Sequence, residues 1–127
     1  MKKIQESPPS FRVGWFKREE DKRAIEMILH YCDKIDSHIE YFGDDKELFL
    51  ENIHYQDACA LVIIQIGEHV DRLSDEFKNS HSEIPWREIK DMRNLHAHNY
   101  ESVMYDILWV TIKRDVPELR EYLEKLI

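Results

Sequence analysis

Residues 58–70 read ACALVIIQIGEHV and form the most apolar stretch of this 127-residue chain. Apolar side chains occupy so many of these positions that little room is left for a polar face, which indicates a helix buried on most sides. Asn52 is a suitable N-cap, so we predict a central helix over residues 52–73. Gly67 costs such a helix roughly 1 kcal/mol relative to alanine. It therefore indicates a close contact with another helix, unless it is simply tolerated.

The residues before the central helix predict a second long helix. Over residues 18–42 the apolar positions follow a three-and-four spacing, and Gly43 stands where a helix C-cap is expected. Residues 1–17 contain Pro8-Pro9 and no helical periodicity, so we expect an extended N-terminal arm. The domain itself would then occupy residues 18–127.

Further helices are expected after the central one. Ser74 suggests a short new helical turn, and Pro85 suits the first position of a third helix. A fourth helix is expected from about Ser102, and a last one follows Asp115 as N-cap with Pro117 in its first turn. The connections are short and residues that favour strands are scarce. We therefore predict an all-α fold, a compact antiparallel bundle of four to five helices.

Composition narrows the class of protein. The hydrophobic content of 43% supports one core of ordinary size, and the net charge of −8 argues against nonspecific coating of nucleic acid. The sequence contains no apolar run long enough to span a bilayer and no signal-peptide core, so we expect a cytoplasmic protein without membrane contact. Cys32 and Cys59 fall within helical patterns and are expected to be buried free thiols rather than a disulfide.

Residues 92–100 read MRNLHAHNY and hold the densest set of chemically active groups in the chain. Arg93 is a permanent cation whose planar fork suits phosphate, His98 can exchange a proton near neutral pH, and Tyr100 carries a phenolic hydroxyl. The flanking segment is locally positive within an acidic chain. On an ideal helix, however, Arg93 and His98 lie about 140° apart. They can meet only if the helix ends near His96 or if a second subunit supplies the other copy across a two-fold axis.

Two alternatives to this site carry less support. His96 and His98 form a His-x-His pair, but residues two apart on a helix point in different directions. Glu51 and His54 form one Glu-x-x-His pair, whereas a di-iron bundle needs two such pairs and two more carboxylates. We therefore expect no metal and no cofactor. The acidic residues beside the central helix, Glu68 and Asp71, fit its solvated edge.

The polar motif and its surroundings resemble a known family. Arg93, followed by four residues, His98, one residue and Tyr100, is similar to the motif of the HEPN superfamily, in particular its HepT-like toxin branch. The stretch from Leu61 to Glu68, the Pro85-Trp86 pair and the tail around Val116-Pro117 resemble the same branch in the same order. The resemblance covers residues 18–126, and the N-terminal arm lies outside it.

This resemblance implies a HEPN-like domain that homodimerises, with the two motifs lining a shared cleft. It implies a toxin of a toxin–antitoxin pair that acts as a metal-independent RNA endonuclease. Arg93 would hold the scissile phosphate, His98 would be the general acid or base, and Asn94 would support them. Tyr100 would accept AMP from an MNT-type nucleotidyltransferase antitoxin. His96 is not part of the shared motif.

An alternative function belongs to a different class of protein. The domain would be a non-catalytic helical module that binds a nucleotide or a partner, with Tyr100 serving only as the acceptor of the modification. Cleavage of RNA and modification of Tyr100 are separate measurements, so the two functions are distinguishable by experiment.

Overall fold

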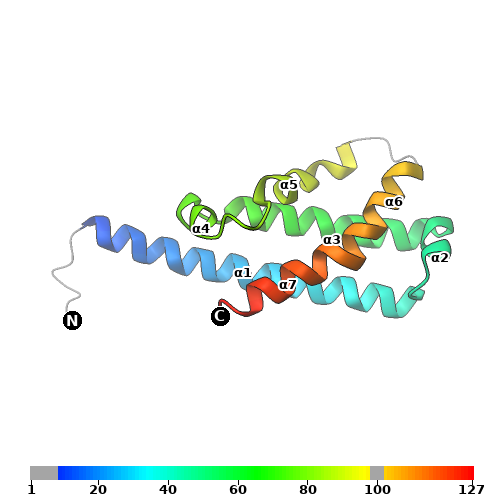
Figure 1. The fold of residues 1–127 in the computed structure, drawn as a ribbon, viewed down its shortest axis with the longest axis horizontal. Helices are drawn as coiled ribbons and strands as arrows, with labels where there is room; N and C mark the ends of the chain where they lie inside the picture. Colours follow the sequence, from blue (N-terminus) through cyan, green and yellow to red (C-terminus); the bar gives the residue numbers. More distant parts are fainter. Residues whose placement is uncertain (1–8, 98–101) are drawn as a thin grey trace.

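Two long antiparallel helices, α1 (Pro9–Phe42) and α3 (Ile53–Arg72), form the centre of the molecule (Figure 1). The computed structural model describes the backbone of residues 9–97 and 102–127, and the side chains of residues 19–94 and 104–127. All elements in this part of the chain are helical. The predicted all-α class and antiparallel bundle are therefore confirmed, while the expected dimer stays a prediction.

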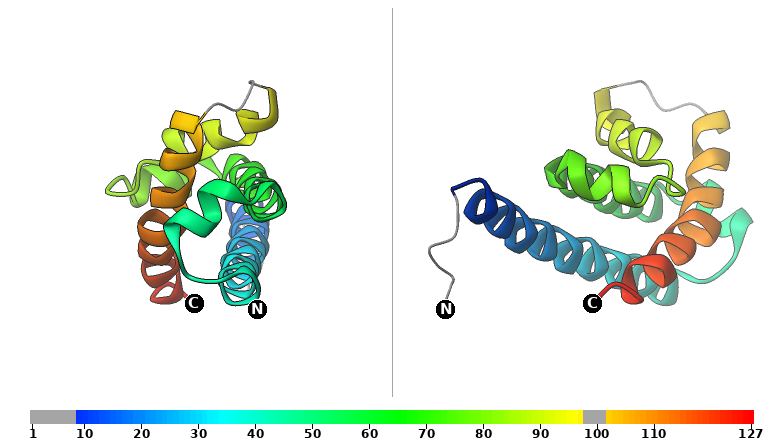
Figure 2. Two further views of the ribbon diagram at one scale, coloured as in Figure 1. Left: turned by 90° about the vertical axis from the view of Figure 1, so that its right-hand side faces the viewer. Right: turned by 60° about the vertical axis from the view of Figure 1, so that its left-hand side comes forward.

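The central helix predicted from the apolar stretch is α3. Its N-cap is Asn52, whose side-chain oxygen accepts hydrogen bonds from the backbone N–H groups of His54 and Tyr55 at 2.9 and 3.2 Å. On one side α3 packs against α1, and on the other against α5 (Trp86–Asp91) and the 3₁₀ helix η1 (Met92–Ala97). Both views of Figure 2 place α3 between these two layers. The helix is therefore buried on two opposite sides.

The turn between the two long helices is also as predicted. Gly43 ends α1 with a positive φ of 117°, a conformation that L side chains rarely adopt, and its N–H donates to the carbonyl of Ile39 at 2.8 Å. The short helix α2 (Lys46–Glu51) follows, capped by Asp45. This turn reverses the chain so that α3 can run back along α1.

The N-terminal boundary differs from the prediction. Helix α1 begins at Pro9, so residues 9–17 are helical rather than extended, and residues 1–8 lie outside the described part. Pro9 is compatible with this because the first helical position needs no N–H donor and proline's fixed φ already suits a helix. Pro9 thus marks the start of a helix.

The C-terminal fifth of the chain is one helical run instead of two separate helices. Helix α6 (Ser102–Val110) continues through the π-helical segment η2 (Thr111–Asp115) into α7 (Val116–Glu124). Asp115 was expected to be an N-cap, but its backbone is helical and its side chain makes no capping hydrogen bond. The wider π turn just before Pro117 accommodates a residue that can neither donate an i→i−4 hydrogen bond nor tolerate the carbonyl facing its ring.

One core joins these elements. It contains buried apolar residues of α1, α3, α5 and the C-terminal run, among them Ile28, Ile35, Ile63, Ile66, Trp86, Ile112 and Leu123. Cys32 and Cys59 belong to this core as free thiols, as predicted, and burial raises the pKa of each to about 12. None of the helices in the described part of the chain combines the length and apolar content that crossing a membrane requires.

The short helix α4 (Asp75–Ser80) is tied to α1 by a buried carboxylate. Its N-cap is Ser74, as predicted, and the Ser74 hydroxyl accepts the N–H of Phe77 at 3.1 Å. Asp21 of α1 is 7% exposed and accepts hydrogen bonds from the backbone N–H and the hydroxyl of Ser74, both at 2.7 Å. This connection holds the end of α3 against α1.

Replacing Asp21 with alanine is expected to lower the free energy of unfolding by about 2 to 3 kcal/mol, because it removes two hydrogen bonds to a charged acceptor and leaves a partly buried N–H without a partner. Urea denaturation of the two proteins measures this difference. Glu26→Ala, at an exposed position of the same helix, is the matched control and should change the free energy by less than about 0.5 kcal/mol. Equal effects of the two substitutions on the free energy of unfolding would contradict the stabilising role of the Asp21–Ser74 hydrogen bonds.

Candidate active site

Arg93 lies at a change of helix type. Helix α5 begins after Pro85, as predicted, and the indole N–H of Trp86 donates to the carbonyl of His81 at 2.8 Å. The α-helix ends at Asp91, and Arg93 is the second residue of η1. A 3₁₀ helix turns by about 120° per residue, so the angles of an ideal α-helix do not apply to residues 92–97.

Gly67 explains why Arg93 lies so close to α3. A Cβ atom at Gly67 would stand 2.9 Å from the backbone nitrogen of Arg93, 3.1 Å from the carbonyl oxygen of Ile89 and 3.2 Å from the Cβ of Arg93. These are backbone atoms or atoms fixed to the backbone, so they cannot move aside cheaply. The close helix contact predicted for Gly67 is confirmed.

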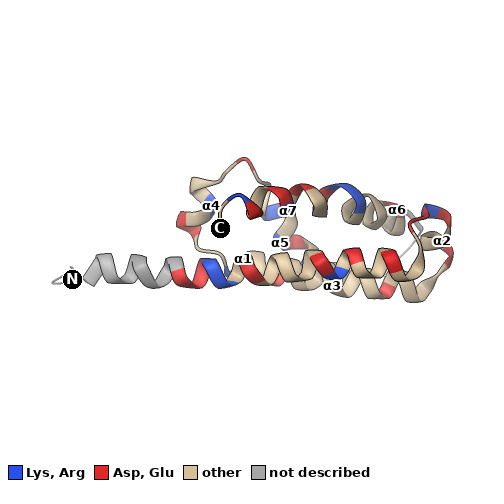
Figure 3. Cartoon of the chain, turned by 90° about the horizontal axis from the view of Figure 1, so that it is seen from below, with Lys and Arg blue, Asp and Glu red and all other residues tan. Residues whose placement is uncertain are grey.

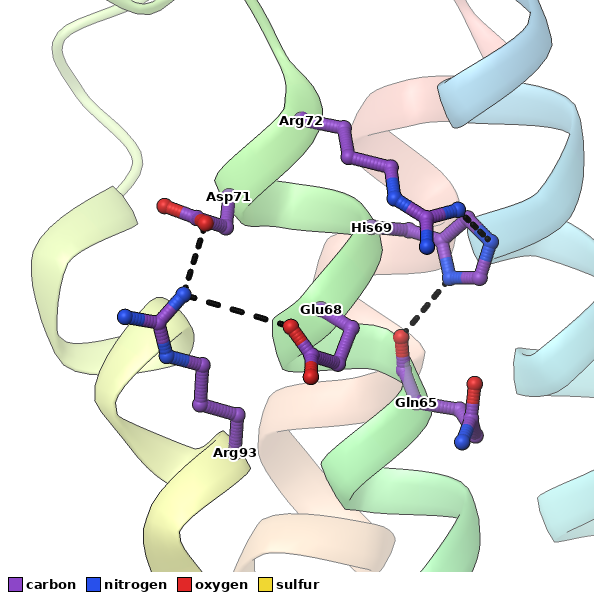
Figure 4. Close-up of polar contacts among 6 residues, drawn as sticks. All are labelled: Gln65, Glu68, His69, Asp71, Arg72 and Arg93. Atoms are coloured by element: carbon purple, nitrogen blue, oxygen red, sulfur yellow. Dashed lines mark hydrogen bonds and ion pairs between the residues drawn. The ribbon is translucent and has the colours of Figure 1, made fainter.

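The Arg93 side chain is fixed by two carboxylates of α3. Its Nη1 atom lies 2.6 Å from Oδ2 of Asp71 and 3.9 Å from Oε1 of Glu68 (Figure 4). The side chain remains 34% exposed, so part of the guanidinium faces solvent. From the sequence, Asp71 and Glu68 were expected only to form the solvated edge of the central helix. The structure shows that they also bind Arg93. They orient Arg93 and offset part of the positive charge predicted for this segment.

The structure describes only part of the predicted motif. Asn94 is exposed in η1, next to Arg93. The backbone of His96 lies in the same helix, which ends at Ala97. A helix end near His96 is one of the two conditions under which Arg93 and His98 were expected to meet. His98 and Tyr100 lie outside the described residues. That Arg93 and His98 act together therefore stays a prediction.

Sequence reasoning missed the two carboxylates that hold Arg93. Glu68 and Asp71 are three residues apart, so they share one face of α3, and both follow closely on Gly67. A glycine that admits a neighbouring helix, followed by two carboxylates on one face, was a signal that an arginine of that neighbour could be held there.

No metal centre is found in the described part of the chain. No group of three or more His, Cys, Asp or Glu residues is placed there to hold an ion. The only two thiols of the sequence, Cys32 and Cys59, are buried and their raised pKa keeps them protonated near neutral pH.

The helical layers and the arginine of the motif from Arg93 to Tyr100 are those of a HEPN-like domain. Within that class, a family model described as Ribonuclease HepT-like matches residues 19–126. The chain belongs to the HepT-like family. The resemblance found in the sequence is thereby confirmed, and the prediction of a ribonuclease is confirmed at the level of the family.

Related proteins share most of their length with this chain. It is 44% identical over 108 residues to the "Probable ribonuclease HepT" of Thermococcus cleftensis, covering 85% of this chain and 90% of that protein. It is 33% identical over 103 residues to a candidate RNase of Caldanaerobacter subterraneus subsp. tengcongensis, covering 81% and 90% of the two chains. A candidate RNase of Methanocaldococcus jannaschii is 33% identical over 107 residues, covering 84% and 90%. No solved structure matches the chain.

Proposed function

We propose that this protein is a metal-independent RNA endonuclease acting in the cytoplasm, the toxin of a toxin–antitoxin pair. The observation that carries the proposal is the ion pair between Arg93 and Asp71, which holds a partly exposed guanidinium in one orientation at the start of the motif. Membership of a ribonuclease family supports RNA as the substrate.

The chemistry needs a cation for the phosphate and a group that transfers protons. Arg93 stabilises the negative charge that develops on the scissile phosphate, which suits a guanidinium that can donate two hydrogen bonds. His98 acts as general acid or base on the ribose 2′-OH or the leaving 5′-oxygen. Asn94, next to Arg93, orients the histidine or a phosphate oxygen. This division of labour needs no metal ion.

We propose that the active site is shared between two subunits. Homodimerisation about a two-fold axis would place the motif of one subunit beside that of its partner, so that both copies of Arg93 and His98 line one cleft. Light scattering at micromolar concentration tests this part of the proposal. A monomer that still cleaves RNA would rule out the shared site.

The proposed regulation acts on Tyr100. An MNT-type nucleotidyltransferase antitoxin transfers AMP from ATP to the phenolic oxygen, which loses its proton while pyrophosphate leaves. The added phosphate repels RNA and blocks the cleft. Co-expression with such an antitoxin followed by intact-mass measurement should show AMP-sized additions that disappear in Tyr100→Phe.

Cleavage of RNA in the presence of EDTA tests the catalytic proposal. The purified protein should cut RNA without added metal, and His98→Ala should lower the rate by about a hundredfold or more, the usual contribution of a general acid or base. Undiminished cleavage by His98→Ala would remove that residue from the mechanism. Loss of all cleavage in EDTA, restored by a divalent cation, would overturn the metal-independent reaction.

One observation, the pairing of Arg93 with carboxylates, also fits the non-catalytic alternative. An arginine held by two carboxylates is also what a purely structural ion pair requires. In that case the domain binds a nucleotide or a partner, and Tyr100 is only the acceptor of AMP. The mass measurement would then show the additions while the cleavage assay shows none.

A further inference from the structure

A cavity lies on the side of α3 that faces α1, close to the last turn of α3. Its volume is about 440 Å³, within the usual range for small-molecule sites. The cavity is lined by Glu20, Arg23, Ala24, Met27, His69 and Arg72. It thus combines two arginines and one carboxylate with an apolar strip from Ala24 and Met27.

Arg72 is oriented in this cavity by a neutral partner. The Nδ1 atom of His69 lies 2.8 Å from the carbonyl oxygen of Gln65, which can only accept, so Nδ1 carries the hydrogen. The Nε2 atom is then free to accept a hydrogen bond from Nη1 of Arg72 at 3.2 Å (Figure 4). His69 is 7% exposed and packs against the ring of Tyr31. A buried and positioned imidazole therefore holds the guanidinium without offsetting its charge.

Arg23 and Arg72 lack the carboxylate partners that three other described arginines have, and Arg87 of α5, which also lacks one, does not line this cavity. Arg93 is paired with Asp71, Arg120 with Asp36 at 2.7 Å, and Arg114 with Asp115 at 3.0 Å. Among the described residues, neither Arg23 nor Arg72 forms an ion pair. Acidic residues, red in Figure 3, recur along α1, α3 and α7, in keeping with the net charge of −8. Two unpaired arginines in one cavity of such a protein indicate an anionic ligand.

We propose that this cavity binds a phosphate group, carried either by a free nucleotide or by an RNA strand. Arg72 uses one nitrogen for His69 and keeps its other N–H donors for the ligand, and Arg23 supplies a second guanidinium. The apolar strip of Ala24 and Met27 suits the sugar or base next to the phosphate. The site lies on the other side of α3 from the Arg93 ion pair (Figure 4). Binding of a phosphate there therefore does not require Arg93 to take part in RNA cleavage.

Binding of two probes to the full-length protein tests the proposal. The probes are AMP, measured by calorimetry, and a 2′-O-methyl RNA oligonucleotide, which offers phosphodiesters but no 2′-OH, measured by fluorescence anisotropy. The double variant Arg23→Gln/Arg72→Gln should weaken binding of at least one probe by about tenfold or more. Arg114→Gln is the matched control, because Arg114 also lines a cavity but is already paired with Asp115, and it should leave binding unchanged.

A second variant excludes misfolding as the cause. Glu20→Gln removes the carboxylate found among the described residues that line the cavity, and it should tighten binding severalfold. Arg93→Gln should retain binding of AMP, which separates this site from the proposed active site. Effects on AMP alone identify a nucleotide site, and effects on the oligonucleotide alone identify a contact with the strand. No binding of either probe, or equal binding by the native protein and the double variant, would overturn the inference.

Discussion

Replacing Arg93 with alanine is expected to slow RNA cleavage by about a hundredfold to a thousandfold, the usual cost of losing one donor that stabilises a developing negative charge. The fold should survive this change. The Arg93–Asp71 pair joins side chains that are 34% and 42% exposed, and such pairs contribute at most about 1 kcal/mol. Loss of activity with little loss of stability is therefore the expected pattern.

Two further variants sharpen this prediction. Asp71→Asn keeps Arg93 but removes its closest carboxylate, so cleavage should fall less than in Arg93→Ala. Arg87→Ala removes an exposed arginine of α5 in the same basic segment and is the matched control. Rates are measured with a labelled RNA, and thermal unfolding is measured in parallel. If Arg93→Ala cleaves RNA as fast as Arg87→Ala does, Arg93 has no catalytic role. The result would then favour a structural role for the Arg93 ion pair.

Gly67→Ala is expected to destabilise the protein by about 1 to 3 kcal/mol, the range found for overfilled helix contacts. Alanine favours a helix by roughly 1 kcal/mol over glycine, but here its Cβ would stand 2.9 Å from the backbone nitrogen of Arg93. The segment from Ile89 to Arg93 must then move away from α3. Because Arg93 moves with it, the ion pair to Asp71 should lengthen and cleavage should fall as well.

Chemical denaturation and the cleavage assay together measure this effect. The control is Asp57→Ala at an exposed position of α3, which should change stability by less than about 0.5 kcal/mol. A Gly67→Ala protein that is more stable than the native one would show that the gain in helix propensity outweighs the close contact. It would also show that η1 can move away from α3 with little loss of free energy.

The fold was predictable where a single residue marks an end or a turn. Asn52 and Ser74 cap their helices, Gly43 closes α1, and Pro85 precedes α5, all as expected from local chemistry. Pro117 lies in the first turn of α7, as predicted, although α7 continues the helical run before it. Pro9 was misinterpreted because proline can either interrupt a helix or begin one. Proline interrupts a helix in general, but it begins one at the first position and is tolerated beside a π turn.

The candidate site was less predictable because it depends on contacts between distant parts of the chain. The motif around Arg93 was visible in the sequence, but the helix type that carries it was not, and the α-helical angles used for it do not hold in η1. Asp71 precedes Arg93 by 22 residues and meets it only because Gly67 lets the two helices approach. Arg23 and Arg72 come from different helices and share a cavity only in the folded chain.

The last turn of α3 supports several functions at once. Asp71 holds Arg93, Arg72 lines the phosphate cavity, and Ser74 follows immediately and is bound to Asp21 of α1. Helix ends are the parts of a fold that fray first, and fraying here would release both arginines together. The Asp21–Ser74 hydrogen bonds oppose that local opening, so a carboxylate that touches neither arginine helps to keep both in place.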